Sequence, residues 1–149
     1  MLLHHSNYVQ IGIVKNVNHL HTCIAVKNGK VIASGRNSSL NQVHAEISVI
    51  QKLMKLCGII KIRKINLLYS IKNYSKLLSL CNSITLYIVR VKKDGSFGNS
   101  SPCKHCLNML QLLKVKKIIF SNEEGLLETH KTINYSTTFL TSMDRNFPR

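Results

Sequence analysis

Residues 84–120, ITLYIVRVKKDGSFGNSSPCKHCLNMLQLLKVKKIIF, carry the pattern that decides the fold. The stretch opens with residues 84–91, where β-branched, aromatic and nearly continuous apolar character predicts a buried strand. Apolar residues then recur at helical spacing between Cys106 and Leu113, and residues 117–120 read as a second strand. Strands that alternate with helices are typical of an α/β domain.

The residues before this stretch continue the same alternation. Two short β-compatible runs, 23–26 and 30–33, flank the pair Asn28-Gly29, which is a strong signal for a tight hairpin turn. An amphipathic helix that ends near Gly58 follows from apolar residues at spacings of three and four, namely Val43, Ile47, Ile50 and Met54. We therefore predict a three-layer α-β-α sandwich in which helices cover both faces of a mixed sheet of about five strands.

The chain length favours one domain over residues 1–149, because two well-packed domains would need more residues. The core is expected over about 22–120. Within it, residues 59–82 lack a clean period apart from a short helix over 74–80, and they read as an insertion. The polar tail, 121–149, is expected to add one strand near residues 126–129.

The formal net charge is +15, from 21 Lys and Arg against 6 Asp and Glu. Two interpretations stay open: attraction to the phosphates of a nucleotide or a nucleic acid, or an A+T-rich coding sequence that enriches Lys, Asn and Ile. No apolar run is long enough for a membrane span, and the first residues do not resemble a signal peptide. Because the five Cys do not suggest a disulfide framework, we expect a cytoplasmic, reducing location without membrane association.

Two short motifs carry the chemistry, and each is expected to open a helix: His44-Ala45-Glu46 and Pro102-Cys103-Lys104-His105-Cys106. Each motif is modest alone, since a Cys-x-x-Cys pair also suits a redox site or half of a structural zinc site. Together and in this order they match the H-x-E and P-C-x-x-C signature of zinc deaminases. A redox pair would not require the His-x-Glu motif at a second helix.

On these motifs the chain resembles the cytidine and deoxycytidylate deaminase superfamily, which also includes tRNA adenosine deaminases and guanine deaminases. The resemblance covers about Thr22 to Phe120 and implies a mixed sheet sandwiched by helices. One departure is the 56 positions between Glu46 and Pro102, which is longer than in compact members. We assign the excess to the insertion over 59–82.

The resemblance implies that Zn²⁺ is held by His44, Cys103 and Cys106. One imidazole and two thiolates leave the fourth tetrahedral position open for water, whereas a structural site would close it with a fourth protein ligand. Zinc lowers the pKa of that water toward about 7. Glu46 is then expected to act as the general acid and base, and not as a ligand.

The same resemblance implies substrate contacts from Asn37 to the ribose, from the backbone N–H of Ala45 to the ring, and from the backbone carbonyl of Ser101 to the amine. The alternative for Asn37 is a turn residue after a strand. His105 is expected to face solvent or to orient a ligand.

Other His and Cys residues have plainer interpretations. Four histidines could hold a second metal ion or be ordinary surface residues: His4, His5, His19 and His21. Three cysteines are expected to be buried thiols: Cys23, Cys57 and Cys81.

The sequence Ser101-Pro102-Cys103 is similar to the motif of cytidine and deoxycytidylate deaminases, and a histidine at the first ligand position resembles the deoxycytidylate-like branch. This resemblance implies a hydrolase that converts a cytosine nucleoside or nucleotide to the uracil form and releases ammonia. An alternative is deamination of cytosine or adenosine in a polynucleotide such as tRNA, other RNA or single-stranded DNA, which the positive charge favours and the scarcity of aromatic residues disfavours. A further alternative is a catalytically silent zinc scaffold, although such a site would have no use for Glu46. Relatives commonly form oligomers, so self-association is expected.

Overall fold

The computed structural model describes residues 21–37, 43–59 and 71–140. Its strands form one sheet in the order β2-β1-β3-β5-β6, with the short β4 paired to β3. The strands are β1 (His21–Lys27), β2 (Lys30–Arg36), β3 (Thr85–Val91), β4 (Phe97–Gly98), β5 (Lys117–Ser121) and β6 (Leu127–Lys131). Only the pair β3 and β5 is parallel among these described strands, so the predicted α/β class and mixed sheet are confirmed.

The hairpin between β1 and β2 turns where the sequence predicts it. Asn28 and Gly29 have φ angles of 50° and 75°, which are the left-handed values that a tight two-residue hairpin requires. Both strands extend past the predicted runs, β1 back to His21 and β2 forward to Arg36. The extension matters because it carries both strand ends to the mouth of the pocket described below.

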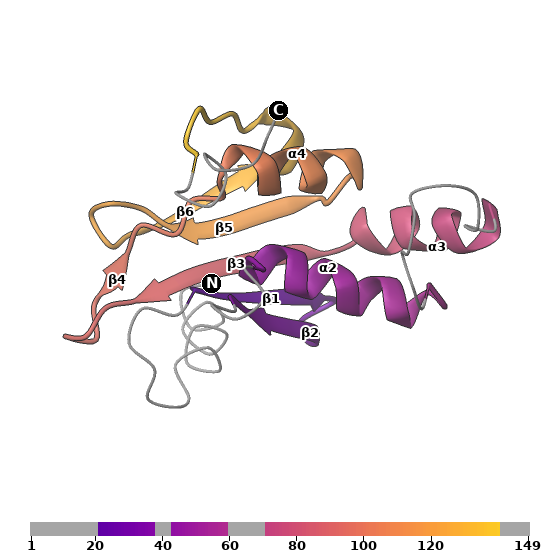
Figure 1. The fold of residues 1–149 in the computed structure, drawn as a ribbon, viewed down its shortest axis with the longest axis horizontal. Coiled ribbons are helices and arrows are strands. Elements are labelled where there is room, and N and C mark those ends of the chain that lie inside the picture. The colour runs from indigo at the N-terminus through magenta and orange to yellow at the C-terminus, as the bar shows by residue number, and fades with distance from the viewer. Residues whose placement is uncertain (1–20, 38–42, 60–70, 141–149) are drawn as a thin grey trace.

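Three α-helices are described: α2 (Ala45–Leu56), α3 (Ile71–Cys81) and α4 (Lys104–Leu112), and a short 3-10 helix, η1 (Thr132–Asn134), follows β6. Figure 1 shows α2 alongside β1 and β2, and α4 alongside β5 and β6. The three α-helices bury residues in one core cluster with alternate residues of the sheet, among them Cys23, Ala25, Leu86, Ile88 and Ile118. They therefore cover the same face.

The buried face of α2 differs from the predicted one in detail. Val49 and Leu53 are 0% exposed, whereas Ile47 is only partly buried. The opposite face of the sheet buries a second set of strand residues, which are Ile24, Val26, Tyr87 and Ile119. None of the helices in the described ranges covers that face, so the predicted second helix layer stays a prediction.

The region predicted as an insertion is described only in part. Helix α3 includes the predicted short helix and begins three residues earlier, at Ile71. Residues 60–70 lie outside the described residues, so the insertion stays a prediction. Over the described ranges, no helix has the length and apolar character that crossing a bilayer demands.

Candidate active site

The three predicted metal ligands come together where α2 and α4 begin. His44 precedes the first residue of α2, Cys103 precedes the first residue of α4, and Cys106 lies in the first turn of α4. Nδ1 of His44 is 3.2 Å from Sγ of Cys106 and 3.6 Å from Sγ of Cys103. All three ligand atoms lie within 4.8 Å of one another.

This donor set fits zinc. One imidazole nitrogen and two thiol sulfurs are ligands that zinc takes in tetrahedral sites, and three protein ligands leave one position for water or substrate. Cys103 and Cys106 are 3% and 0% exposed, so the thiols are shielded from bulk solvent. Because His44 and Cys103 also line a pocket, the group borders a space that a small molecule can enter.

Glu46 lies beside this group, in the first turn of α2, and is only 5% exposed. A carboxylate at this position is favoured by the positive end of the helix dipole, which offsets part of the cost of its burial. Beneath it, burial and the Glu46 carboxylate raise the pKa of the Cys23 thiol well above its ordinary value. Cys23 therefore stays protonated and adds no charge beside Glu46.

Gly35 of β2 allows α2 to start this close to the sheet. A Cβ atom at Gly35 would lie 2.8 Å from Cβ and Oγ of Ser48 and 3.0 Å from the carbonyl oxygen of Ala45. These distances are shorter than the contacts that side chains tolerate, so only glycine fits without displacing the helix. The close approach sets the depth of His44 and Glu46 relative to the sheet.

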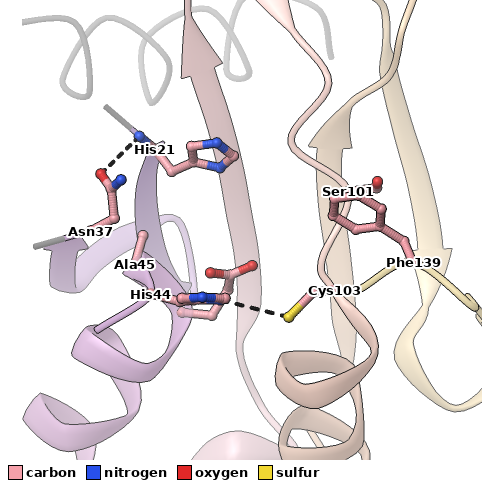
Figure 2. Close-up of a pocket in the computed structure, with 8 residues that line it drawn as sticks. His21, Asn37, His44, Ala45, Ser101, Cys103 and Phe139 are labelled. Carbon is pink, nitrogen blue, oxygen red and sulfur yellow. Dashed lines mark hydrogen bonds between the residues drawn. The ribbon is translucent and has the colours of Figure 1, made fainter. Parts of the chain in front are cut away.

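The pocket is a cavity of about 100 Å³ in which the two halves of the site face each other (Figure 2). One side is built by the ends of β1 and β2 and the start of α2. The other side is built by the segment before α4 and by the chain after η1. The lining residues are His21, Asn37, His44, Ala45, Glu46, Ser101, Cys103 and Phe139.

All three predicted substrate-binding residues lie in this lining. Asn37 is fixed by a reciprocal pair of bonds to β1: its Oδ1 accepts from the backbone N–H of His21 at 3.1 Å, and its own N–H donates to the His21 carbonyl at 3.2 Å. The side-chain oxygen of Asn37 is thus bonded to β1, and the side-chain NH₂ group points away from that strand. These bonds hold Asn37 at the end of the β1–β2 ladder and within the pocket lining, and its contact with a ribose stays a prediction.

The segment that carries Ser101 and Cys103 is fastened by a buried pair of serines. Oγ of Ser100 donates to the carbonyl of Ile88 at 2.6 Å and accepts from the backbone N–H of Ser121 at 2.9 Å. Its oxygen is also 2.7 Å from Oγ of Ser121, which donates to the carbonyl of Gly98 at 2.6 Å. The pair ties the segment before α4 to both β3 and β5.

His21 and Phe139 are pocket residues that the sequence does not predict as such. His21 is half-buried and lines the pocket, while His4, His5 and His19 lie outside the described residues. Burial, then the positive charge of Arg90 and then His44, lower the pKa of His21 to about 4. Its imidazole is therefore neutral at neutral pH, with one nitrogen that donates and one that accepts.

The remaining predicted residues are less central. His105 is exposed on α4, in line with a solvent-facing role. The predicted buried thiols are confirmed: Cys23, Cys57 and Cys81 are buried and free. Burial also raises the pKa of Cys81 to about 12, so this thiol stays protonated and packs as an apolar side chain.

Comparison with known families agrees with this geometry. Residues 13–122 match the family described as the cytidine and deoxycytidylate deaminase zinc-binding region. No curated protein sequence matches the chain. The match spans most of the chain and includes both motifs, and the group formed by His44, Cys103 and Cys106 supplies the donor set for Zn²⁺. The protein therefore belongs to the zinc-binding cytidine and deoxycytidylate deaminase family, which implies a hydrolytic deaminase.

Proposed function

We propose that the protein hydrolyses the exocyclic amine of a cytosine nucleoside or nucleotide, which gives the uracil form and ammonia. The observation that carries this proposal is the buried carboxylate of Glu46, which lines the same pocket as His44 and Cys103. A structural metal site gains nothing from a nearly buried acid beside its ligands, because burial of the charge costs free energy.

In the proposed reaction, His44, Cys103 and Cys106 hold the zinc ion. When bound, zinc supplies Lewis acidity that lowers the pKa of a water molecule to about 7. Glu46 takes a proton from the attacking water and delivers protons to the ring nitrogen and then to the departing amine. The new bond joins oxygen to the ring carbon, and the bond from that carbon to the amine nitrogen breaks.

The other lining residues would hold the substrate for this step. We propose that the backbone N–H of Ala45 donates to the ring, that the backbone carbonyl of Ser101 accepts from the amine, and that the NH₂ of Asn37 donates to a sugar oxygen. The neutral His21 ring lines the same pocket and carries no positive charge that would pair with the Glu46 carboxylate.

The alternative substrate is a polynucleotide, which the net charge of +15 favours because a strand of phosphates would be attracted to it. We also propose that the chain self-associates and works in the reducing cytoplasm, where none of its five cysteines would be driven into a disulfide. Light scattering in solution measures the self-association.

The test measures ammonia release and absorbance change with cytidine, CMP, dCMP, guanine and a short single-stranded oligonucleotide. Glu46→Gln should keep one zinc ion per chain and lose turnover, because the amide cannot accept the proton. The matched control is Glu128→Gln, which changes an acid of β6 outside the pocket and should leave turnover intact.

The outcomes separate the alternatives. Turnover of one cytosine compound that disappears in Glu46→Gln supports the proposal, and turnover of the oligonucleotide alone supports the polynucleotide alternative. A zinc-loaded protein that is silent on every compound would overturn the enzyme proposal in favour of a zinc-stabilised scaffold.

A further inference from the structure

The chain after η1 returns to the site and is fastened to the helix that carries the two thiols. The backbone N–H of Lys104, the first residue of α4, donates to the carbonyl of Phe139 at 2.8 Å. Farther along α4, Nε2 of Gln111 donates to the carbonyls of Thr132 and Tyr135 at 3.0 and 2.9 Å. Both ends of the segment 132–139 are thus bonded to α4.

Side-chain packing holds the same segment against the sheet. The ring of Tyr135 packs on Phe120 and His130, with ring centroids 5.2 and 4.8 Å apart. Burial raises the pKa of the Tyr135 hydroxyl, and a hydrogen bond with Ser101, itself a pocket residue, opposes part of that rise. The position of Phe139 is therefore set by the framework that also sets Ser101 and Cys103.

Phe139 places an apolar ring in the wall of the pocket. Phe139 is 47% exposed, so its ring is not packed into the core. In Figure 2 its ring and the imidazole of His21 project from opposite sides toward the space above His44 and Cys103. A flat heterocycle that enters this space meets an aromatic side chain on each side.

We propose that Phe139 contacts the heterocycle of the substrate and helps to select planar aromatic compounds for the site. This inference rests on the proposed function, since it assumes that the pocket binds a base. Phe139 lies beyond residues 13–122, so the family match does not assign it a role. The tail thereby becomes part of the binding site.

The test measures binding apart from turnover. In protein that carries Glu46→Gln, titration calorimetry gives the Kd of cytidine, CMP and dCMP with and without Phe139→Ala. Loss of an aromatic contact to a base should weaken binding by on the order of 10-fold. Phe139→Tyr should keep the affinity, and Phe139→Leu, which keeps an apolar side chain but no flat ring, should weaken it by about 3-fold or more.

The matched control is Ile133→Ala, which removes an apolar side chain of the same segment that is 81% exposed and outside the pocket. It should leave Kd unchanged, and every variant should keep its zinc. With Glu46 restored, Phe139→Ala should raise KM more than it lowers kcat.

Two failures can be told apart. If the parent protein binds none of the compounds, the proposed function falls and this inference falls with it. If the parent binds one of them and both Phe139→Ala and Phe139→Leu bind it equally well, the inference alone is overturned.

Discussion

The two helices that meet at the site begin in similar ways but are fixed by different means. His44 before α2 and Cys103 before α4 both have extended backbone, with φ and ψ of −72° and 153° and of −68° and 164°. The thiol of Cys103 accepts a hydrogen bond from the backbone N–H of Cys106 at 3.4 Å, whereas the His44 side chain makes no capping bond. One helix start is organised by its own residues and the other by the sheet.

This difference divides the site into two halves. The half at the start of α4, which we call the local half, is capped by its own residue, and the half at the start of α2, which we call the tertiary half, is positioned by packing on the sheet. Cys103 caps the helix and stands ready as a ligand in the same conformation. His44 and Glu46 gain their positions from the close packing of Ser48 of α2 on Gly35 of β2. Changes near α4 should therefore act on the helix start directly, and changes near α2 should act through packing.

The largest effect is expected at Cys103, where capping and metal binding can be separated. Cys103→Ala and Cys103→Ser should both lose zinc and lower turnover by more than about 100-fold, since even residues that only support a ligand cost 10–100-fold. Without metal, Ser keeps a capping oxygen and Ala does not, so Ala should be less stable than Ser by about 1 kcal/mol in urea unfolding. Equal stability of the two metal-free variants would contradict the local half of the comparison.

Gly35→Ala tests the tertiary half. The added Cβ meets Ser48 and the Ala45 carbonyl, so the free energy of unfolding should fall by up to about 3 kcal/mol, and zinc affinity should fall because His44 is displaced. Adding Ser48→Gly should restore part of the loss. Gly98→Ala is the control, because its Cβ would meet only the flexible side chains of Arg90 and Lys92. Similar losses at the two glycines would argue against the close helix contact.

Ser100→Ala tests how much the bonds from the segment before α4 to the sheet contribute to the free energy of unfolding. It leaves the buried N–H of Ser121 without its acceptor, so we expect a loss of about 2 kcal/mol in urea unfolding. Ser136→Ala, at an exposed serine, should change stability by less than about 0.5 kcal/mol. A double-mutant cycle with Ser121→Ala gives the coupling, and additive losses would mean that the two hydroxyls act separately.

The last effect concerns pH, develops gradually over the titration range, and belongs to the α2 half. The pKa of His21 is about 4 in the fold and 6.5 when unfolded, so between these values the unfolded chain binds more protons. Stability of the metal-free protein should therefore fall as pH drops from 6.5 toward 4, with a contribution from His21 of at most about 1.4 kcal/mol per pH unit.

His21→Gln should remove this contribution, which urea unfolding at several pH values measures as a shallower slope. His105→Gln, at an exposed position on α4, is the matched control and should keep the parent slope. If stability of His21→Gln depends on pH as steeply as that of the parent protein, another group causes the pH dependence.

Much of the fold follows from short-range patterns. Asn28-Gly29 turns the first hairpin, helical spacing predicts α2 and α4, and the apolar run over 84–91 forms β3. The strand expected near residues 126–129 is β6, one residue later. These elements are recognisable because their signals lie within ten or so consecutive residues.

The rest depends on contacts between distant parts of the chain. His21 enters the pocket because Asn37 pairs with it from 16 positions away, and no periodic pattern marks that pairing. Phe139 lies in a polar tail and reaches the site through the backbone of Lys104. Strand β4 has two residues, too few for any pattern. The ligand motif, by contrast, is visible because metal chemistry restricts both residue types and spacing.

The pairing of β1 with β3 also sets an order of events during folding. Cys103 and Cys106 are neighbours in sequence, but His44 lies 59 positions before Cys103 and reaches it only when the strands before and after His44 have joined in one sheet. Contacts over such separations form slowly, because the entropy of closing the chain is lost before they can stabilise it. The two thiols can hold a metal ion in a partly folded chain, but the complete set of ligands exists only in the assembled one. Tight zinc binding therefore reports that the domain has finished folding.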